Sequence, residues 1–130
     1  MNIAQLQQLK ETEDKVEFKE GKHNFTYNGG SHNAQEERRK CYLGYIVAFA
    51  NECGGTLVLG MADAFPHQVV GSDFGEGKIG ALEDDVYAKL GIRIRHEELD
   101  VLFVFNSFSD KSSRQFHQRC VSKCDGRMAQ

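Results

Sequence analysis

Hydrophobic and polar positions along the chain predict short helices and strands in mixed order. Charged and apolar residues alternate at 16–20 and 92–95, and apolar residues run almost without interruption at 56–61 and 100–105. These patterns and a short returning segment predict strands at 16–20, 56–61, 68–71, 92–95 and 100–105. Apolar residues at helical spacing predict helices at 3–14, from 31 or 33 to 53, and at 76–90. Because helices and strands do not alternate strictly, we expect an α+β fold with a mixed β-sheet packed by two to three helices.

Two features mark the boundaries of these elements. Gly54 and Gly55 end the second helix, since glycine adopts the left-handed conformation of a helix C-cap without steric cost. The strand at 56–61 is nearly all apolar, so we expect it in the centre of the sheet, covered on both faces. We predict one domain over 1–106, followed by an atypical polar tail over 107–130 that has no periodicity and is expected to be disordered.

Composition excludes some classes of protein. The chain of 130 residues has a formal net charge of -3, which argues mildly against an obligatory polynucleotide partner, although charge can be segregated on one face. No apolar run approaches the roughly 20 residues that span a bilayer, so we expect no membrane association and a cytoplasmic location.

The four cysteines are too few and too scattered for us to expect a disulfide framework. Cys41 and Cys53 fall in the second predicted helix and are expected to be small buried hydrophobic residues. His117, Cys120 and Cys124 offer three metal ligands, but a structural zinc site normally needs four. We therefore predict no cofactor from this pattern.

Two motifs about forty residues apart carry a resemblance to a known family. The first is Val16–Lys19, with the sequence V-E-F-K, and the second is Ala48–Gly60, where a helix ends in A-N-x-x-G-G and a strand follows. With Asp63 and Val69–Gly71, the ordered set resembles the Schlafen-type, Alba-like nucleic-acid-binding domain of bacterial regulators. The resemblance covers 5–105. After that point the proline-bearing turn and later strands of the family are replaced by the polar tail.

The resemblance implies a possible catalytic centre. In Schlafen endoribonucleases, two glutamates and one aspartate form a metal-dependent nuclease site, and the matching residues here are Glu13 (or Glu11), Glu17 and Asp63. Such carboxylates, Glu17 and Asp63 above all, suit Mg2+ or Mn2+, which activates water and stabilises phosphoryl charge. Thr12 stands at the family's usual spacing before Glu17. The ordinary alternative is a solvated strand glutamate and a turn aspartate.

Binding of DNA or RNA without cleavage is the second function that the resemblance implies. Basic side chains along the predicted strands and helix are available for phosphate contacts; they are Lys19, Lys22, Arg38, Arg39, Lys40, Arg93 and Arg95. Three aromatic side chains in the loop over 21–33 are candidates for base stacking; they are His23, Phe25 and Tyr27. The alternative for each cation is an ion pair or solvent contact.

Two further functions differ in class. Relatives are often catalogued as ATP-binding or related to the RecG helicase, but this chain has no G-x-x-x-x-G-K-[ST] motif, so we expect no intrinsic ATPase. A protein-interaction module is the other, with self-association as a homodimer if the strand at 101–105 lies at a sheet edge. We expect above all a transcriptional-regulator-like nucleic-acid-binding domain, with the nuclease and the interaction module as alternatives.

Overall fold

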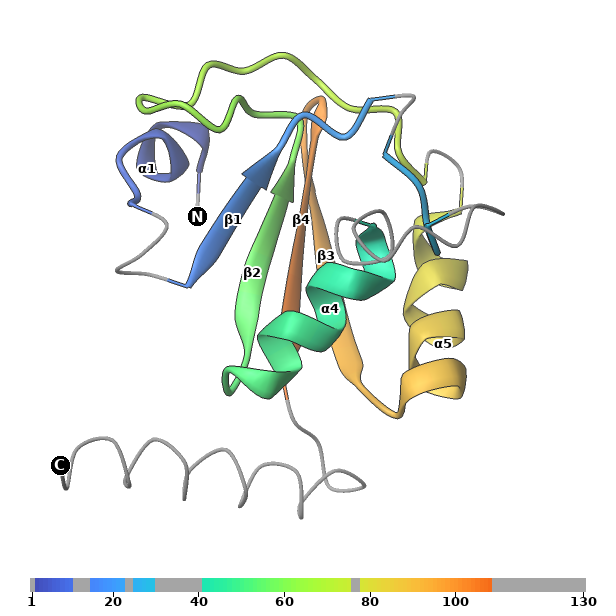
Figure 1. Ribbon diagram of the computed structural model, residues 1–130. Helices are drawn as coiled ribbons and strands as arrows, with labels where there is room; N and C mark the ends of the chain where they lie inside the picture. Colours follow the sequence, from blue (N-terminus) through green and yellow to red (C-terminus); the bar gives the residue numbers. More distant parts are fainter. Residues whose placement is uncertain (1, 11–14, 23–24, 30–40, 76–77, 109–130) are drawn as a thin grey trace, which may run out of the picture.

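The computed structural model describes residues 2–10, 15–22, 25–29, 41–75 and 78–108, which contain three helices and four strands (Figure 1). In chain order the elements are α1 (Ile3–Gln7), β1 (Val16–Lys19), α4 (Tyr42–Asn51), β2 (Gly55–Leu59), α5 (Ile79–Leu90), β3 (Arg93–Leu99) and β4 (Leu102–Phe108). The segment at 68–71 does not form a full hairpin strand, because its only pairing among these residues is a single bridge between Met61 and Val69.

The four strands form one mixed sheet in the order β1-β2-β4-β3. β1 pairs parallel to β2, whereas β2 with β4 and β4 with β3 are antiparallel. The predicted α+β class with a mixed sheet and two to three helices is therefore confirmed. β2 lies inside the sheet, as its apolar sequence predicts.

The strand predicted at 101–105 is not an edge strand, because β4 lies between β2 and β3. The two edges are instead β1 and β3. β1 is only four residues long and carries Glu17 and Lys19. On β3, the backbone N–H of His96 donates to the carboxylate of Glu83 on α5 at 3.0 Å. This N–H is therefore not available to pair with another strand. Short or charged edges discourage pairing with other chains.

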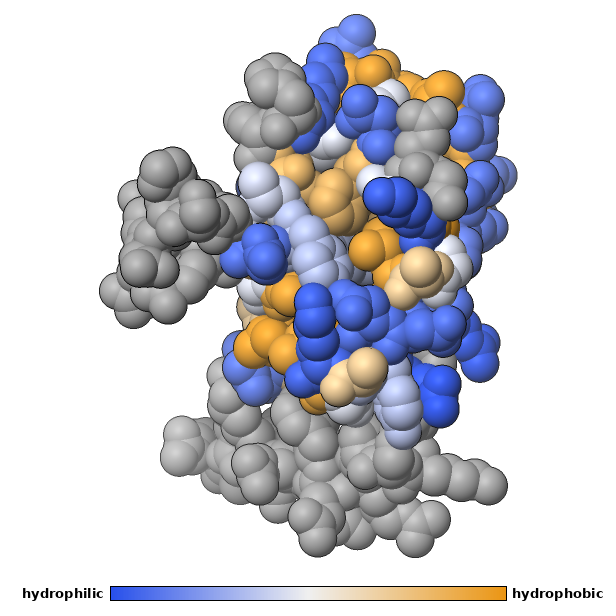
Figure 2. Space-filling view, turned by 90° about the vertical axis from the view of Figure 1, so that its right-hand side faces the viewer, coloured by the Kyte–Doolittle hydropathy of each residue, from blue (hydrophilic) through white to orange (hydrophobic). Residues whose placement is uncertain are grey.

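Apolar clusters lie on both faces of the sheet. Leu57, Leu59, Phe103 and Phe105 pack with α4 and α5 on one face. The alternate positions, which include Phe18 and Val58, pack with Leu6 of α1 on the other face. On the side of the molecule that carries α5, hydrophilic and hydrophobic residues are interspersed (Figure 2). Among the described residues, no helix is long and apolar enough to cross a bilayer.

α4 begins later than the sequence pattern predicts. Cys41 has an extended backbone, and its Sγ accepts a hydrogen bond from the Gly44 N–H at 3.3 Å. The first two N–H groups of the helix donate to the backbone carbonyls of Thr26 and Tyr27. The prediction of one continuous helix from 31 or 33 is therefore wrong at position 41. The predicted start itself lies outside the described residues.

The end of α4 corrects the role predicted for the glycine pair. Cys53, and not a glycine, is the first left-handed residue after the helix, with φ 71°. It lies outside α4 and is half-buried, whereas Cys41 is buried as predicted. Gly54 follows with φ 104°. Gly55 is needed for a different reason, since a Cβ atom there would overlap the ring of Phe49. The glycine lets α4 approach β2 closely.

β4 runs through Phe108, two residues past the predicted domain end at 106. Ser107 pairs with Gly55 on one side and Ile94 on the other, so it belongs to the sheet. The rest of the predicted tail, with His117, Cys120 and Cys124, lies outside the described residues.

We predict that Gly55→Ala destabilises the domain by about 1–3 kcal/mol, because the new methyl group displaces the Phe49 ring from its packing position. The measurement is the urea unfolding midpoint. Gly80→Ala is the matched control, since Gly80 lies in α5 with no atom within 4 Å of the added Cβ. It should be neutral or stabilising. Equal midpoints for the two variants would contradict the packing role of Gly55.

Candidate nucleic-acid interface

Edge strand β1 divides its side chains between the two faces of the sheet. Val16 and Phe18 are buried in the cluster on the α1 side. Glu17 and Lys19 pair in register with Leu57 and Leu59, which face α4, and so lie on the α4 side. This separation follows from the two-residue period of a strand, which gives a spacing of about 6–7 Å between alternate residues.

Lys15, the residue before β1, extends the same row of charges. Its Nζ donates a hydrogen bond to the Glu52 carbonyl, 3.0 Å away, at the C-terminal end of α4. A helix C-terminus carries partial negative charge, so it is a favourable place for a lysine. The lysine remains exposed. Exposed Lys22 stands beyond the opposite end of β1.

Lys19 contacts both β1 and α4. Its Nζ lies 3.3 Å from Glu17 Oε1 and 5.5 Å from the centre of the Tyr45 ring. Partial burial on its own would lower the pKa of Lys19, but hydrogen bonding to Tyr45 and the charge of Glu17 outweigh it and raise the pKa above its usual value. Lys19 is therefore a stable cation at neutral pH.

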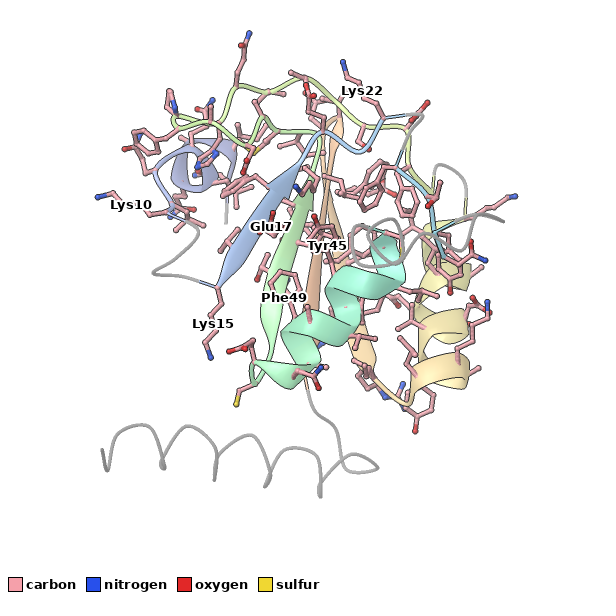
Figure 3. All side chains as sticks on the ribbon, in the orientation of Figure 1. Lys10, Lys15, Glu17, Lys22, Tyr45 and Phe49 are labelled. Carbon is pink, nitrogen blue, oxygen red and sulfur yellow. The ribbon has the colours of Figure 1, made fainter. Side chains whose placement is uncertain are left out.

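Two aromatic side chains of α4 lie beside these charges. Tyr45 and Phe49 are one helical turn apart, and both are half-buried against the core. Tyr45 lies beside β1 and Phe49 over the start of β2; Figure 3 shows both near Glu17, with Lys15 toward one end of β1 and Lys22 toward the other. We call this surface the β1–α4 stripe; it consists of Lys15, Glu17, Lys19, Lys22, Tyr45 and Phe49.

The structure divides the predicted phosphate-binding cations between two edges of the sheet. Lys19 and Lys22 belong to the β1–α4 stripe, whereas Arg93 and Arg95 are on β3, with β2 and β4 between them. The Arg93 guanidinium lies 4.1 Å from the centre of the Tyr87 ring of α5. Arg38, Arg39 and Lys40 lie outside the described residues.

Two aromatic residues predicted to stack on bases pack against the protein itself. Phe25 meets Phe74 edge-on at 5.0 Å. Tyr27 stacks on Tyr42 at 5.7 Å, and its hydroxyl donates to the Asp85 carboxylate on α5. These contacts anchor residues 25–29 to the core. The third predicted residue, His23, lies outside the described residues.

The contact between Tyr27 and Asp85 shifts the pKa values of both side chains. Burial and the neighbouring Asp85 raise the pKa of Tyr27 above its usual value. Hydrogen bonds from Tyr27 and then Lys89 hold the pKa of Asp85 below its ordinary value of 3.8. Lys89 Nζ lies 3.1 Å from Asp85 Oδ2. The contact therefore stabilises the fold when Asp85 is ionised.

We predict that Tyr27→Phe reduces the acid sensitivity of folding. A depressed carboxyl pKa contributes stability that is fully present above the unfolded pKa and is lost as the pH falls through the folded pKa. The wild-type protein should therefore lose more stability than the variant as the pH falls below about 4. Urea unfolding at pH 7 and pH 3 measures this difference. An identical loss in both proteins would show that the contact does not contribute.

The predicted catalytic carboxylates occupy different surroundings. Glu17 lies on the α4 side of β1, paired with Lys19. Exposed Asp63 belongs to the loop after Met61. In that loop the ring nitrogens of His67 lie 3.0 and 2.9 Å from the carbonyl oxygens of Ala62 and Leu9, and the ring stacks on Phe18 on the α1 side.

Glu11 and Glu13 lie outside the described residues. Within the part of the chain that the structure describes, no group of three or more His, Cys, Asp or Glu residues is placed to hold a metal ion. The nuclease site with Mg2+ or Mn2+ stays a prediction.

Sequence patterns alone did not single out three residues of the stripe. Lys15 stands two residues before Glu17, but its backbone is left-handed, with φ 52°, so the period of the strand does not predict the direction of its side chain. Tyr45 and Phe49 show the spacing of a helix face, which by itself indicates only packing against a core. Their place beside β1 depends on the approach of α4 that Gly55 allows.

Fold and surface together define a small α+β domain with a charged, aromatic stripe on an edge strand. The model of the Schlafen, AlbA_2 family matches residues 12–105, most of the chain. The chain belongs to this family, which confirms the resemblance found in its motifs. The same comparisons gave no match to a curated protein or to a solved structure. Membership of the family suggests a nucleic-acid-related function.

Proposed function

We propose that this domain binds nucleic acid through the β1–α4 stripe and acts as a regulatory, transcriptional-regulator-like module in the cytoplasm, without ATPase activity of its own. The observation that carries the proposal is the set of cations at edge strand β1: Lys15 before it, Lys19 at its end beside Tyr45, and Lys22 beyond it. Family membership supports the same class of partner.

The charge of the stripe matters more for this proposal than the net charge of the chain. Lys15 and Lys19 stand at the two ends of β1: Lys15, with φ 52°, directly precedes the strand, and Lys19 is its last residue. Both side chains lie on the α4 side, so one nucleic-acid strand reaches both. A local row of cations attracts phosphates even on a protein whose total charge is -3.

The N-terminus of α4 is not arranged to bind the phosphate of a free nucleotide. A helix N-terminus holds phosphate through N–H groups that no other acceptor occupies. In α4 three of these groups already donate, two to the carbonyls of Thr26 and Tyr27 and one to the Cys41 sulfur. We therefore assign phosphate contacts to the lysines of the stripe.

We predict that replacing Lys15 and Lys22 together with glutamine weakens binding about tenfold at 50 mM salt. Two lost phosphate contacts should also reduce the slope of log affinity against log salt by about 1.5. The measurement is fluorescence anisotropy with a labelled RNA hairpin, a matched DNA duplex and a single strand. Lys78→Gln is the control, since Lys78 is an exposed lysine at the start of α5 that is not part of the stripe.

A loss of the same size in Lys78→Gln would show that the attraction is diffuse and that the stripe is not the site. No binding by the wild-type protein to any of the three probes would show that the proposed function is wrong. Self-association as a homodimer is a separate prediction, and sedimentation of the same preparations tests it.

A further inference from the structure

Glu17 is unexpected in a surface built only for phosphates. It lies between Lys15 and Lys19 on the same side of β1, so the charges along the strand are positive, negative and positive. A continuous phosphate backbone over this row would bring a phosphate close to the carboxylate. The negative charges of the phosphate and the carboxylate would repel each other there. The middle of the row therefore suits a group that donates hydrogen bonds.

The carboxylate of Glu17 is accessible for such a contact. Its side chain is 28% exposed, and the ion pair with Lys19 is formed through Oε1. An ionised carboxylate has about four acceptor positions, so one lysine does not exhaust it. The ion pair with Lys19 also fixes the position of the carboxylate on β1. Glu17 is thus a hydrogen-bond acceptor that its ion pair with Lys19 keeps in place and that remains partly exposed to solvent.

Unpaired bases carry the donors that fit this acceptor. In a duplex the Watson–Crick edges are occupied by pairing, and phosphates form the outer surface. In a single strand the edges are open to side chains. Guanine has two donors side by side on that edge, N1–H and N2–H, which match the two oxygens of a carboxylate. Uracil offers one N–H between two carbonyl oxygens.

The neighbouring aromatic residues favour the same ligand. Tyr45 and Phe49 lie beside Glu17 on α4, and both retain some exposed surface. Aromatic side chains next to a row of cations are the usual means of binding single strands, because every base has a face that stacks. Lysines at both ends of the row then contact the phosphates on either side of the bound base.

We propose that Glu17 accepts hydrogen bonds from an unpaired base of single-stranded nucleic acid, with guanine preferred. This inference rests on the proposed function, because it names the ligand of the same stripe. It assigns Glu17 a contact with the bound base that requires no metal ion. The discriminating test is therefore base selectivity in the presence of EDTA.

The experiment uses labelled uridine oligonucleotides that differ only in the central base, which is guanine, hypoxanthine or uracil. Hypoxanthine lacks the N2 amino group of guanine. The wild-type protein should bind the guanine strand about tenfold more tightly than the all-uridine strand, with hypoxanthine between them. A DNA series of the same design, with a matched duplex, shows whether the sugar matters and should give weaker binding for the duplex.

Glu17→Gln should reduce the guanine preference to about twofold or less, because an amide presents one acceptor where the carboxylate presents two. Its affinity for the all-uridine strand should be equal or higher, since a negative charge is removed. Glu97→Gln makes the same change at an exposed position on β3, across the sheet, and should keep the tenfold preference. Glu17→Asp retains the charge but shortens the side chain, and it should also lose selectivity.

The possible failures are distinguishable. Equal wild-type affinity for the three central bases would overturn the base contact while leaving the proposed function intact. An equal loss on all three strands in Glu17→Gln and Glu17→Asp would also overturn it, because it would indicate a structural role. Wild-type binding to none of the strands or duplexes would refute the proposed function and this inference together.

Discussion

The placement of β1 beside β2 is the constraint on which the rest of the surface depends. Parallel pairing in one register buries Phe18 next to Val58 and leaves Glu17 next to Leu57, on the side of α4. A slip of one residue would turn the charged side chains into the apolar cluster on the α1 side, which is strongly unfavourable. The burial of Val16 and Phe18 therefore fixes the positions of the charges.

A second constraint sets the distance between α4 and the sheet. Phe49 lies over Gly55, the first residue of β2, where no Cβ atom fits. The helix consequently runs close to β2, and Tyr45, one turn earlier, contacts Lys19 on β1. A glycine that first indicates a helix end thus determines which aromatic side chains stand beside the lysines. The missing side chain of Gly55 thus accounts both for the close packing of α4 on β2 and for the position of Tyr45 beside Lys19.

Local patterns were sufficient for elements whose burial is visible in the sequence. The alternation at 16–20 predicts β1, and the apolar run at 56–61 predicts a central strand. The order of the strands was not accessible, because β4 inserts between β2 and β3 through pairings distant along the chain. The start of α4 also depends on distant residues, since the carbonyls of Thr26 and Tyr27 accept its first N–H groups.

The same distinction explains how far the candidate site could be predicted. Lys19 and Lys22 belong to a recognisable strand and its end, so their residue type and position indicated them. Arg93 and Arg95 look equivalent in sequence, and only the strand order assigns them to the opposite edge. Tyr45 looked like an ordinary core position until α4 was placed beside β1.

A carboxylate within a row of lysines also bears on the acidic balance of the chain. A surface of lysines alone would attract any polyanion, since phosphate contacts carry no sequence information. A carboxylate in that row weakens the general attraction and penalises ligands that place a phosphate there, which is how repulsive elements produce specificity. Modest net charge and selective binding are therefore compatible. The proposed base contact of Glu17 would then limit affinity for duplexes in exchange for discrimination among single strands.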